Sequence, residues 1–260
     1  MVLFKNLNPE IQAVIASLIT WGITALGSGV VFLFKNVKKT TLDAMLSLSA
    51  GVMLAASFFS LLNPAINMAS NLKMNAWLIV AIGFLFGGLL LYTGDKIFNK
   101  KLNSNSKIKR SIMLVASITL HNIPEGMAIG VAFGSIVYGI EGANLVAAIM
   151  LAIGIGIQNF PEGCAISLPL KRDGYSNKLA FMYGALSGIV EPIAAFFGAL
   201  LVLKIRYLLP ILLSFAAGAM IYVVVEELIP ESQTNEKKDL MALATIIGFI
   251  IMMIFDVALG

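Results

Sequence analysis

Two short polar segments inside long apolar runs carry residue types that bind metal ions. They read HNIPEGMAIG (His121–Gly130) and QNFPEGCAIS (Gln158–Ser167). At an offset of 37 residues they share the pattern Asn-x-Pro-Glu-Gly-x-Ala-Ile, preceded by His or Gln. Two matched copies favour a shared chemical role. The alternative is a pair of polar segments that only joins two helices by hydrogen bonds, with each proline as a simple kink.

Helical spacing places the polar groups of each segment on one face. His121 and Glu125 are four residues apart, and Asn122 and Glu125 are three apart, so all three neighbour one another on a helix. At about 100° per residue, the carboxylate of Glu125 falls between the other two side chains. The second segment repeats this arrangement with Gln158, Asn159 and Glu162.

A divalent cation would explain two carboxylates in apolar surroundings. An ionised carboxylate inside a membrane is costly unless it is partnered. Glu125 and Glu162 hold equivalent positions, and a cation between them removes their mutual repulsion. Carboxylate, imidazole and amide oxygen suit Zn²⁺, Fe²⁺ or Mn²⁺ better than Cu⁺. Glu191, followed by Pro192, is expected as a third carboxylate on the same cavity; the alternative is an interhelical hydrogen bond.

The composition requires these segments to lie in a membrane. Apolar residues make up 59% of the 260 residues and charged residues only 12%, against about 25% charged in soluble domains. A single cysteine excludes a disulfide framework, and a single histidine excludes zinc hydrolases that need a His pair. The net charge of +4 comes from basic loops between apolar runs and does not indicate nucleic-acid binding.

Eight apolar runs are long enough to cross a bilayer as helices. They are far longer than the strands of a membrane β-barrel, so the sequence predicts an all-α integral membrane protein, an eight-helix bundle. The predicted spans are Pro9–Phe34, Leu42–Leu62, Ala76–Asp95, Ile108–Gly134, Ala143–Leu170, Lys178–Leu203, Tyr207–Ile229 and Leu240–Leu259.

The distribution of Lys and Arg predicts the orientation. With the N-terminus outside, 14 of the 18 basic residues fall in inner loops and four in outer segments, as the positive-inside rule requires. Eight spans then put both termini outside. Residues 1–260 form one polytopic transmembrane domain, and residues 96–109 are expected to be a cytoplasmic basic loop between the third and fourth helices.

Other acidic residues fall near the ends of the predicted spans. Glu226, Glu227 and Glu231 are either an acidic exit or a solvated helix end. We expect a second group at the membrane interface: Asp43, Asp95 and Asp256.

The sequence resembles the ZIP (Zrt/Irt-like) metal transporters, and in particular their GufA-like branch. The resemblance extends from about the second to the seventh helix. It is carried by GVMLAAS (Gly51–Ser57), HNIPEG (His121–Gly126), QNFPEG (Gln158–Gly163), GIVEP (Gly188–Pro192) and EELIPE (Glu226–Glu231).

The resemblance implies an eight-helix carrier, with both termini outside, that moves divalent metal into the cytosol. It also implies a homodimer, a mid-membrane site and an elevator-like motion of the first, fourth, fifth and sixth helices. A first ion would be held by Met53, His121, Glu125, Gln158 and Glu162. A second ion would be held by Asn122, Glu125, Asn159, Glu162 and Glu191.

Two departures from the family pattern affect the expected metal site. Many members have a second histidine at the position of Gln158, and its absence here is expected to weaken the preference for zinc over harder ions. Some relatives have aspartate at the position of Asn159. With asparagine there, this chain has only three carboxylates for two ions. We expect zinc as the transported substrate, with iron, manganese or cadmium as alternatives, no catalytic cofactor and no enzymatic activity. A passive cation channel and an intramembrane metalloenzyme are the alternative functions. The expected location is the plasma (inner) membrane.

Overall fold

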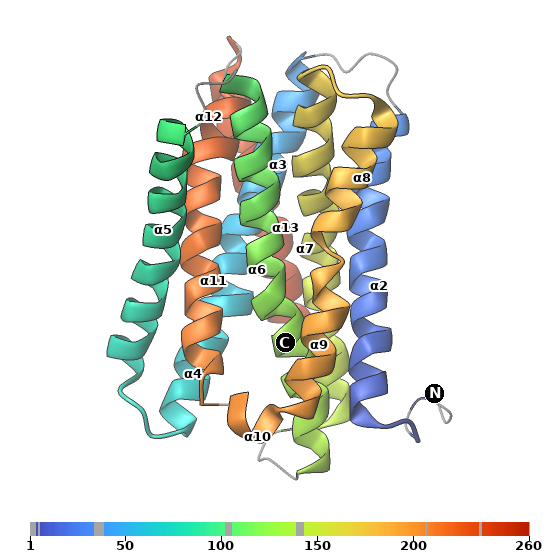
Figure 1. Ribbon diagram of the computed structural model, residues 1–260, viewed down its shortest axis with the longest axis vertical. Helices are drawn as coiled ribbons and strands as arrows, with labels where there is room; N and C mark the ends of the chain where they lie inside the picture. The colour runs from blue at the N-terminus through green and yellow to red at the C-terminus, as the bar shows by residue number, and fades with distance from the viewer. Residues whose placement is uncertain are drawn as a thin grey trace.

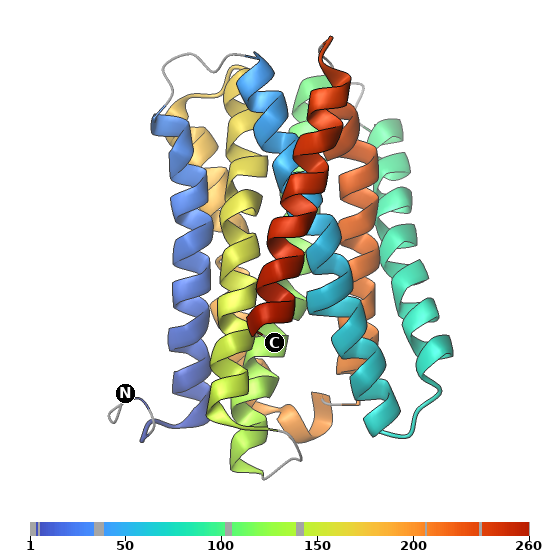
Figure 2. The same cartoon turned by 180° about the vertical axis from the view of Figure 1, so that it is seen from behind.

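The computed structural model is a bundle of helices that run side by side along its long axis (Figure 1, Figure 2). It describes residue 4 and residues 6–33, 39–101, 106–138, 143–205, 207–233 and 236–259. None of these residues forms a β-strand. The all-α prediction is therefore confirmed for the described part of the chain.

Short irregular helices interrupt several of the long ones. η1 is a 3₁₀-helix, and η2 and η3 are π-helical segments. In chain order the elements are α2 (Pro9–Gly29), η1 (Val30–Phe32), α3 (Lys39–Ala56), η2 (Ser57–Leu62), α4 (Asn63–Asn71), α5 (Ala76–Lys101), α6 (Ser106–Val137), α7 (Leu145–Arg172), α8 (Asn177–Ser187), α9 (Val190–Leu200), α10 (Val202–Ile205), α11 (Leu209–Val223), η3 (Val224–Leu228), α12 (Ile229–Ser232) and α13 (Lys238–Leu259).

Seven helical segments are long and apolar enough to cross a membrane, which makes the chain an integral, multi-pass membrane protein. They correspond to seven of the eight predicted spans: Pro9–Phe32, Lys39–Asn71, Ala76–Ile97, Leu145–Arg172, Asn177–Leu200, Leu209–Ser232 and Lys238–Ala258. The remaining predicted span, Ile108–Gly134, lies within the 32-residue helix α6. Its passage through the membrane stays a prediction, because several of its side chains fall outside the described part of the chain.

Outward-facing apolar side chains agree with a lipid environment. On α5, Leu85 and Phe86 are 60% and 62% exposed, and on α13, Ile250 and Ile254 are exposed too. A soluble protein rarely leaves such continuous apolar surface in water.

Local sequence signals explain where several helices begin. α2 starts at Pro9, with Glu10 in its first turn, as the sequence predicted. Asn144 caps α7, because its side-chain oxygen accepts a hydrogen bond from the Ala147 nitrogen at 2.9 Å. Ser176 caps α8 in the same way.

The structure differs from the predicted boundaries in three main places. The predicted second span, Leu42–Leu62, continues as α4 to Asn71. The predicted sixth span is two helices, α8 and α9, separated by a turn at Gly188 and Ile189. The predicted loop 96–109 is helical over most of its length, because α5 continues to Lys101 and α6 begins at Ser106. Residues 102–105 lie outside the described part.

The long helices form two groups. The first group is α2, α6, α7, α8 and α9, and the second is α3, α4, α5, α11, α12 and α13; the groups meet where α3 packs on α7 and α11 on α6. Glycines allow the closest approaches inside each group: Gly163 of α7 contacts the backbone of α2, and Gly126 of α6 contacts that of α9. Gly218 of α11 and Gly248 of α13 do the same against α5 and α3.

Candidate functional site

The amide and carboxylate side chains of both polar segments lie in the interior of the first helix group. The amides and carboxylates from α6, α7 and α9 are at most 2% exposed. We call this set the carboxylate–amide cluster: Asn122, Glu125, Gln158, Asn159, Glu162 and Glu191.

Reciprocal hydrogen bonds connect the two motif helices. Asn122 of α6 donates from Nδ2 to Glu162 Oε1 of α7 at 2.8 Å. Gln158 of α7 donates from Nε2 to Glu125 Oε1 of α6. Each motif therefore supplies an amide to the carboxylate of the other, as expected for two equivalent helices that face each other. The alternative, in which the polar segments only join two helices by hydrogen bonds, also expects such an exchange, so the metal-binding role stays a prediction.

The third carboxylate, Glu191, lies in the first turn of α9, directly after the break between α8 and α9. Asn159 Nδ2 donates to its Oε1 at 2.9 Å. Thr20 Oγ1 donates to its Oε2 at 2.6 Å. A helix N-terminus favours a negative charge at this position. The structure thus brings Glu191 next to the second motif.

Thr20 of α2 is a site residue that the motif comparison missed. Its hydroxyl touches Glu191, and its carbonyl oxygen accepts a weaker bond from Asn159 Nδ2 at 3.4 Å. A signal was present in the sequence, because polar residues recur at helical spacing along one face of this apolar helix. These residues are all buried: Ser17, Thr20, Thr24 and Ser28.

Three amide oxygens in the cluster point to a missing positive partner. Among the described residues, none donates a hydrogen bond to Asn122 Oδ1, Gln158 Oε1 or Asn159 Oδ1, although all three atoms are buried. A buried acceptor without a donor costs about 1–3 kcal/mol. Amide and carboxylate oxygens are ligands for divalent cations, so the residue types of the cluster suit a cation.

Among the described side chains, amide oxygens would have to join the carboxylates to complete a ligand set. Within the described residues, no three His, Cys, Asp or Glu side chains are arranged to hold a metal by themselves. The side chain of His121 lies outside the described part, although its backbone belongs to α6. Met53 of α3 is 2% exposed and packs in the apolar core. The ligand roles of His121 and Met53 stay predictions.

Asp43 lies near the start of α3 and is fully buried within the protein. Its expected position at the membrane interface stays a prediction. Asp256 of α13 accepts a hydrogen bond from Ser60 Oγ at 2.9 Å. Cys164 donates from its buried thiol to Gly27 O at 3.2 Å.

Two adjoining cavities open between the helix groups at the end where α4 and α10 lie (bottom of Figure 1). Their volumes are about 640 Å³ and 270 Å³. Both are lined by Ser60, Pro64 and Asn144. The larger cavity reaches Gly154 on α7, one helical turn before Gln158. Water and ions can therefore come close to the cluster from this end.

Comparison with known proteins gives a consistent family. Residues 99–256 match the family model described as ZIP Zinc transporter. The chain is 38% identical to zinc transporter ZIP11 of Xenopus tropicalis, over 97% of this chain and 98% of that protein. It is 33% identical to zinc transporter GufA of Myxococcus xanthus, over 95% and 98% of the two chains. It is 34% identical to zinc transporter ZupT of Streptococcus mutans, over 88% and 90%.

The chain belongs to the ZIP family. Membership confirms the resemblance seen in the motifs, and the similarity to GufA supports the predicted branch. It also classes the chain with transporters of divalent metal, zinc above all, and not with enzymes. The model match includes both motif segments, so the carboxylate–amide cluster lies in the part of the chain that is common to ZIP proteins.

Proposed function

We propose that this ZIP protein carries zinc across the membrane and into the cytosol through the carboxylate–amide cluster. One observation carries the proposal: three buried carboxylates on three helices meet amides whose oxygens receive no hydrogen bond from any described residue. Such a cluster is expensive in a membrane unless a cation joins it. Zinc is the first choice because of the family, and iron, manganese and cadmium are the alternatives.

In the proposed mechanism, Glu125 and Glu162 bind the ion first. The bound cation would displace the amide NH₂ groups of Asn122 and Gln158 from these carboxylates, and the amides would turn their oxygens toward the metal. His121 and Met53 would complete a first position. Asn159 and Glu191 would extend the site to a second position. Because only three carboxylates face these positions, one ion at a time is the expected occupancy.

The topology completes the proposal. α6 would be the eighth span, so that both termini lie outside and the basic helix ends lie in the cytosol. In a bacterial or plasma membrane the ion would then enter from the cavities between the helix groups. A homodimer is the expected assembly.

Uptake of ⁶⁵Zn²⁺ into proteoliposomes tests the function. Glu125→Ala, Glu162→Ala and the isosteric Glu125→Gln should each lower uptake by about 100-fold or more, since loss of even an outer partner of a metal ligand costs 10–100-fold. Glu236→Gln is the matched control, because Glu236 is exposed and outside every helix. Near-normal uptake by both alanine variants would end the proposal. Slow, saturable flux is expected of a carrier, and fast flux that does not saturate would instead indicate a channel.

A further inference from the structure

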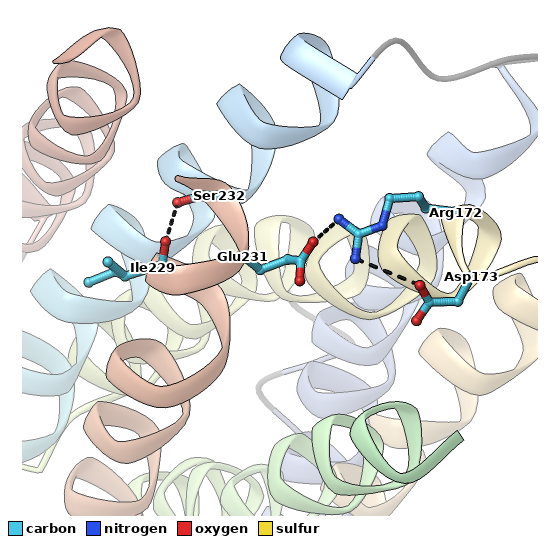
Figure 3. Close-up of polar contacts among 5 residues, drawn as sticks. All are labelled: Arg172, Asp173, Ile229, Glu231 and Ser232. Carbon is cyan, nitrogen blue, oxygen red and sulfur yellow. Dashed lines mark hydrogen bonds and ion pairs between the residues drawn. The ribbon is translucent and has the colours of Figure 1, made fainter. Parts of the chain in front are cut away.

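An ion pair joins the two helix groups at the end opposite to the cavities. Arg172, the last residue of α7 in the first group, pairs through its Nη1 with Glu231 Oε1 of α12 in the second group (Figure 3). The two side chains are 26% and 16% exposed. They are therefore partly shielded from water, which makes their attraction stronger than that of a fully solvated pair.

The direction of Arg172 follows from the register of α7. Gly163 packs on α2, and nine residues separate it from Arg172. At about 100° per residue, nine residues amount to about two and a half turns, which puts the two residues on opposite faces of the helix. Arg172 therefore points away from α2 and toward the second group, where α12 packs on α3.

Glu231 belongs to a short helix of the second group. α12 follows the π-helical segment η3, and Ser232 of α12 is buried and donates from Oγ to Ile229 O at 2.9 Å.

Arg172 has a second carboxylate within reach. Asp173 Oδ1, on the residue that directly follows α7, lies 3.7 Å from Arg172 Nη2 (Figure 3). The planar guanidinium can serve two carboxylates at once. If Glu231 withdraws, Asp173 still partners the charge. The bond across the groups can therefore break without leaving an isolated cation.

The neighbouring basic residue behaves differently. Lys171 Nζ donates to Val31 O of η1 at 2.9 Å. Since η1 continues α2, this contact stays at the first group and does not cross to the second. Lys171 and Arg172 are adjacent in sequence, but this hydrogen bond of Lys171 lies within the first group, whereas the ion pair of Arg172 crosses to the second.

We propose that the Arg172–Glu231 pair is a latch that keeps the two helix groups together at this end while the other end is hollowed by cavities. Breaking the latch lets the groups part here, which opens a path from the carboxylate–amide cluster to the Arg172 end and closes the cavities. The inference rests on the proposed function only in assuming that metal leaves at this end. The latch itself requires no metal.

Thiol labelling of purified protein in detergent, without metal, tests the latch. Cys164→Ser removes the single cysteine and keeps its donor to Gly27 O. Ser49→Cys reports on the boundary, because Ser49 of α3 is 2% exposed and its hydroxyl donates to Pro161 O of α7 at 3.2 Å. Ser135→Cys reports on the opposite end, because it lines the smaller cavity.

Arg172→Gln or Glu231→Gln should raise the maleimide labelling rate at Ser49→Cys roughly tenfold, the shift expected from losing one charge-assisted hydrogen bond. The same substitutions should lower labelling at Ser135→Cys. The double substitution should do no more than the larger single one, because both remove the same contact. Lys171→Gln should change neither rate.

Three results would overturn the latch: unchanged labelling at Ser49→Cys, an equal rise with Lys171→Gln, or a rise at both reporters, which would indicate general loosening. Near-normal zinc uptake by the glutamate variants would contradict the proposed function but would leave the labelling result unaffected, so the two proposals are tested separately.

Discussion

A methyl group at Gly163 is the sharpest test of how the site is held in place. Gly163 follows Glu162 on α7 and packs against α2. A Cβ at this position would collide with the Thr24 carbonyl oxygen and lie 2.7 Å from the Ser28 nitrogen. Both neighbours are backbone atoms of a helix, so neither can rotate away. Gly163→Ala must therefore push α2 and α7 apart.

The size of the effect follows from these contacts. Carbon needs about 3.5 Å to its neighbours, so the helices must separate by roughly 1 Å. Overpacking against backbone lowers the free energy of unfolding by up to about 3 kcal/mol. Replacing glycine by alanine in a helix raises it by about 1 kcal/mol. Gly163→Ala should therefore lower the free energy of unfolding by about 2 kcal/mol. Because Glu162 moves with Gly163, we also expect zinc to bind about tenfold more weakly.

Gly22→Ala is the matched control. Gly22 lies in α2, and no described atom would come within 4 Å of an added Cβ there. This variant should gain about 1 kcal/mol from helix propensity alone. The two variants then differ by about 3 kcal/mol, or roughly 6–12 °C in Tm for a chain of this size. Thermal unfolding in detergent, followed by intrinsic fluorescence, measures the difference. Equal melting temperatures, or a Gly163→Ala variant as stable as the parent, would refute the close α2–α7 contact.

Three further substitutions test the cluster itself. Gln158→His adds an imidazole, so competition assays should show a preference for Zn²⁺ over Mn²⁺ that is about tenfold higher; an unchanged preference would mean that this side chain does not bind the ion. Thr20→Val removes the 2.6 Å bond to Glu191 and should weaken zinc binding in calorimetry by about tenfold or more, whereas Thr20→Ser should not. Asn159→Asp replaces the donor to Glu191 with a like charge, so the metal-free variant should have a lower Tm than the parent. Zinc should raise the Tm of this variant more than it raises that of the parent. A smaller zinc-induced rise would argue against a metal beside Asn159.

The sequence predicted the motif helices well because their signals are local and physical. Helical spacing alone placed Asn122 and Glu125, and their counterparts on α7, on shared faces. The structure then shows the two faces exchanging hydrogen bonds. Apolar run length predicted eight spans, and seven of them correspond to helical segments long and apolar enough to cross a membrane, because the thickness of a bilayer fixes the length of such a helix.

Features that depend on contacts between distant segments were not predictable. The break at Gly188 splits one apolar run into α8 and α9. Hydropathy does not reveal this turn, because packing of the two helices on α2 and α6 stabilises it. The burial of Asp43 depends on which helices cover it. Thr20 could be recognised as a site residue only once the structure placed the polar face of α2 beside Glu191.

Zinc-edge anomalous diffraction from zinc-soaked crystals tests the central claim most directly. Binding by the carboxylate–amide cluster predicts a peak about 2.0–2.2 Å from carboxylate oxygens of both Glu125 and Glu162, with the amides of Asn122 and Gln158 turned to present their oxygens. Glutamates still bonded to those amides, with the zinc peak elsewhere or absent, would contradict it.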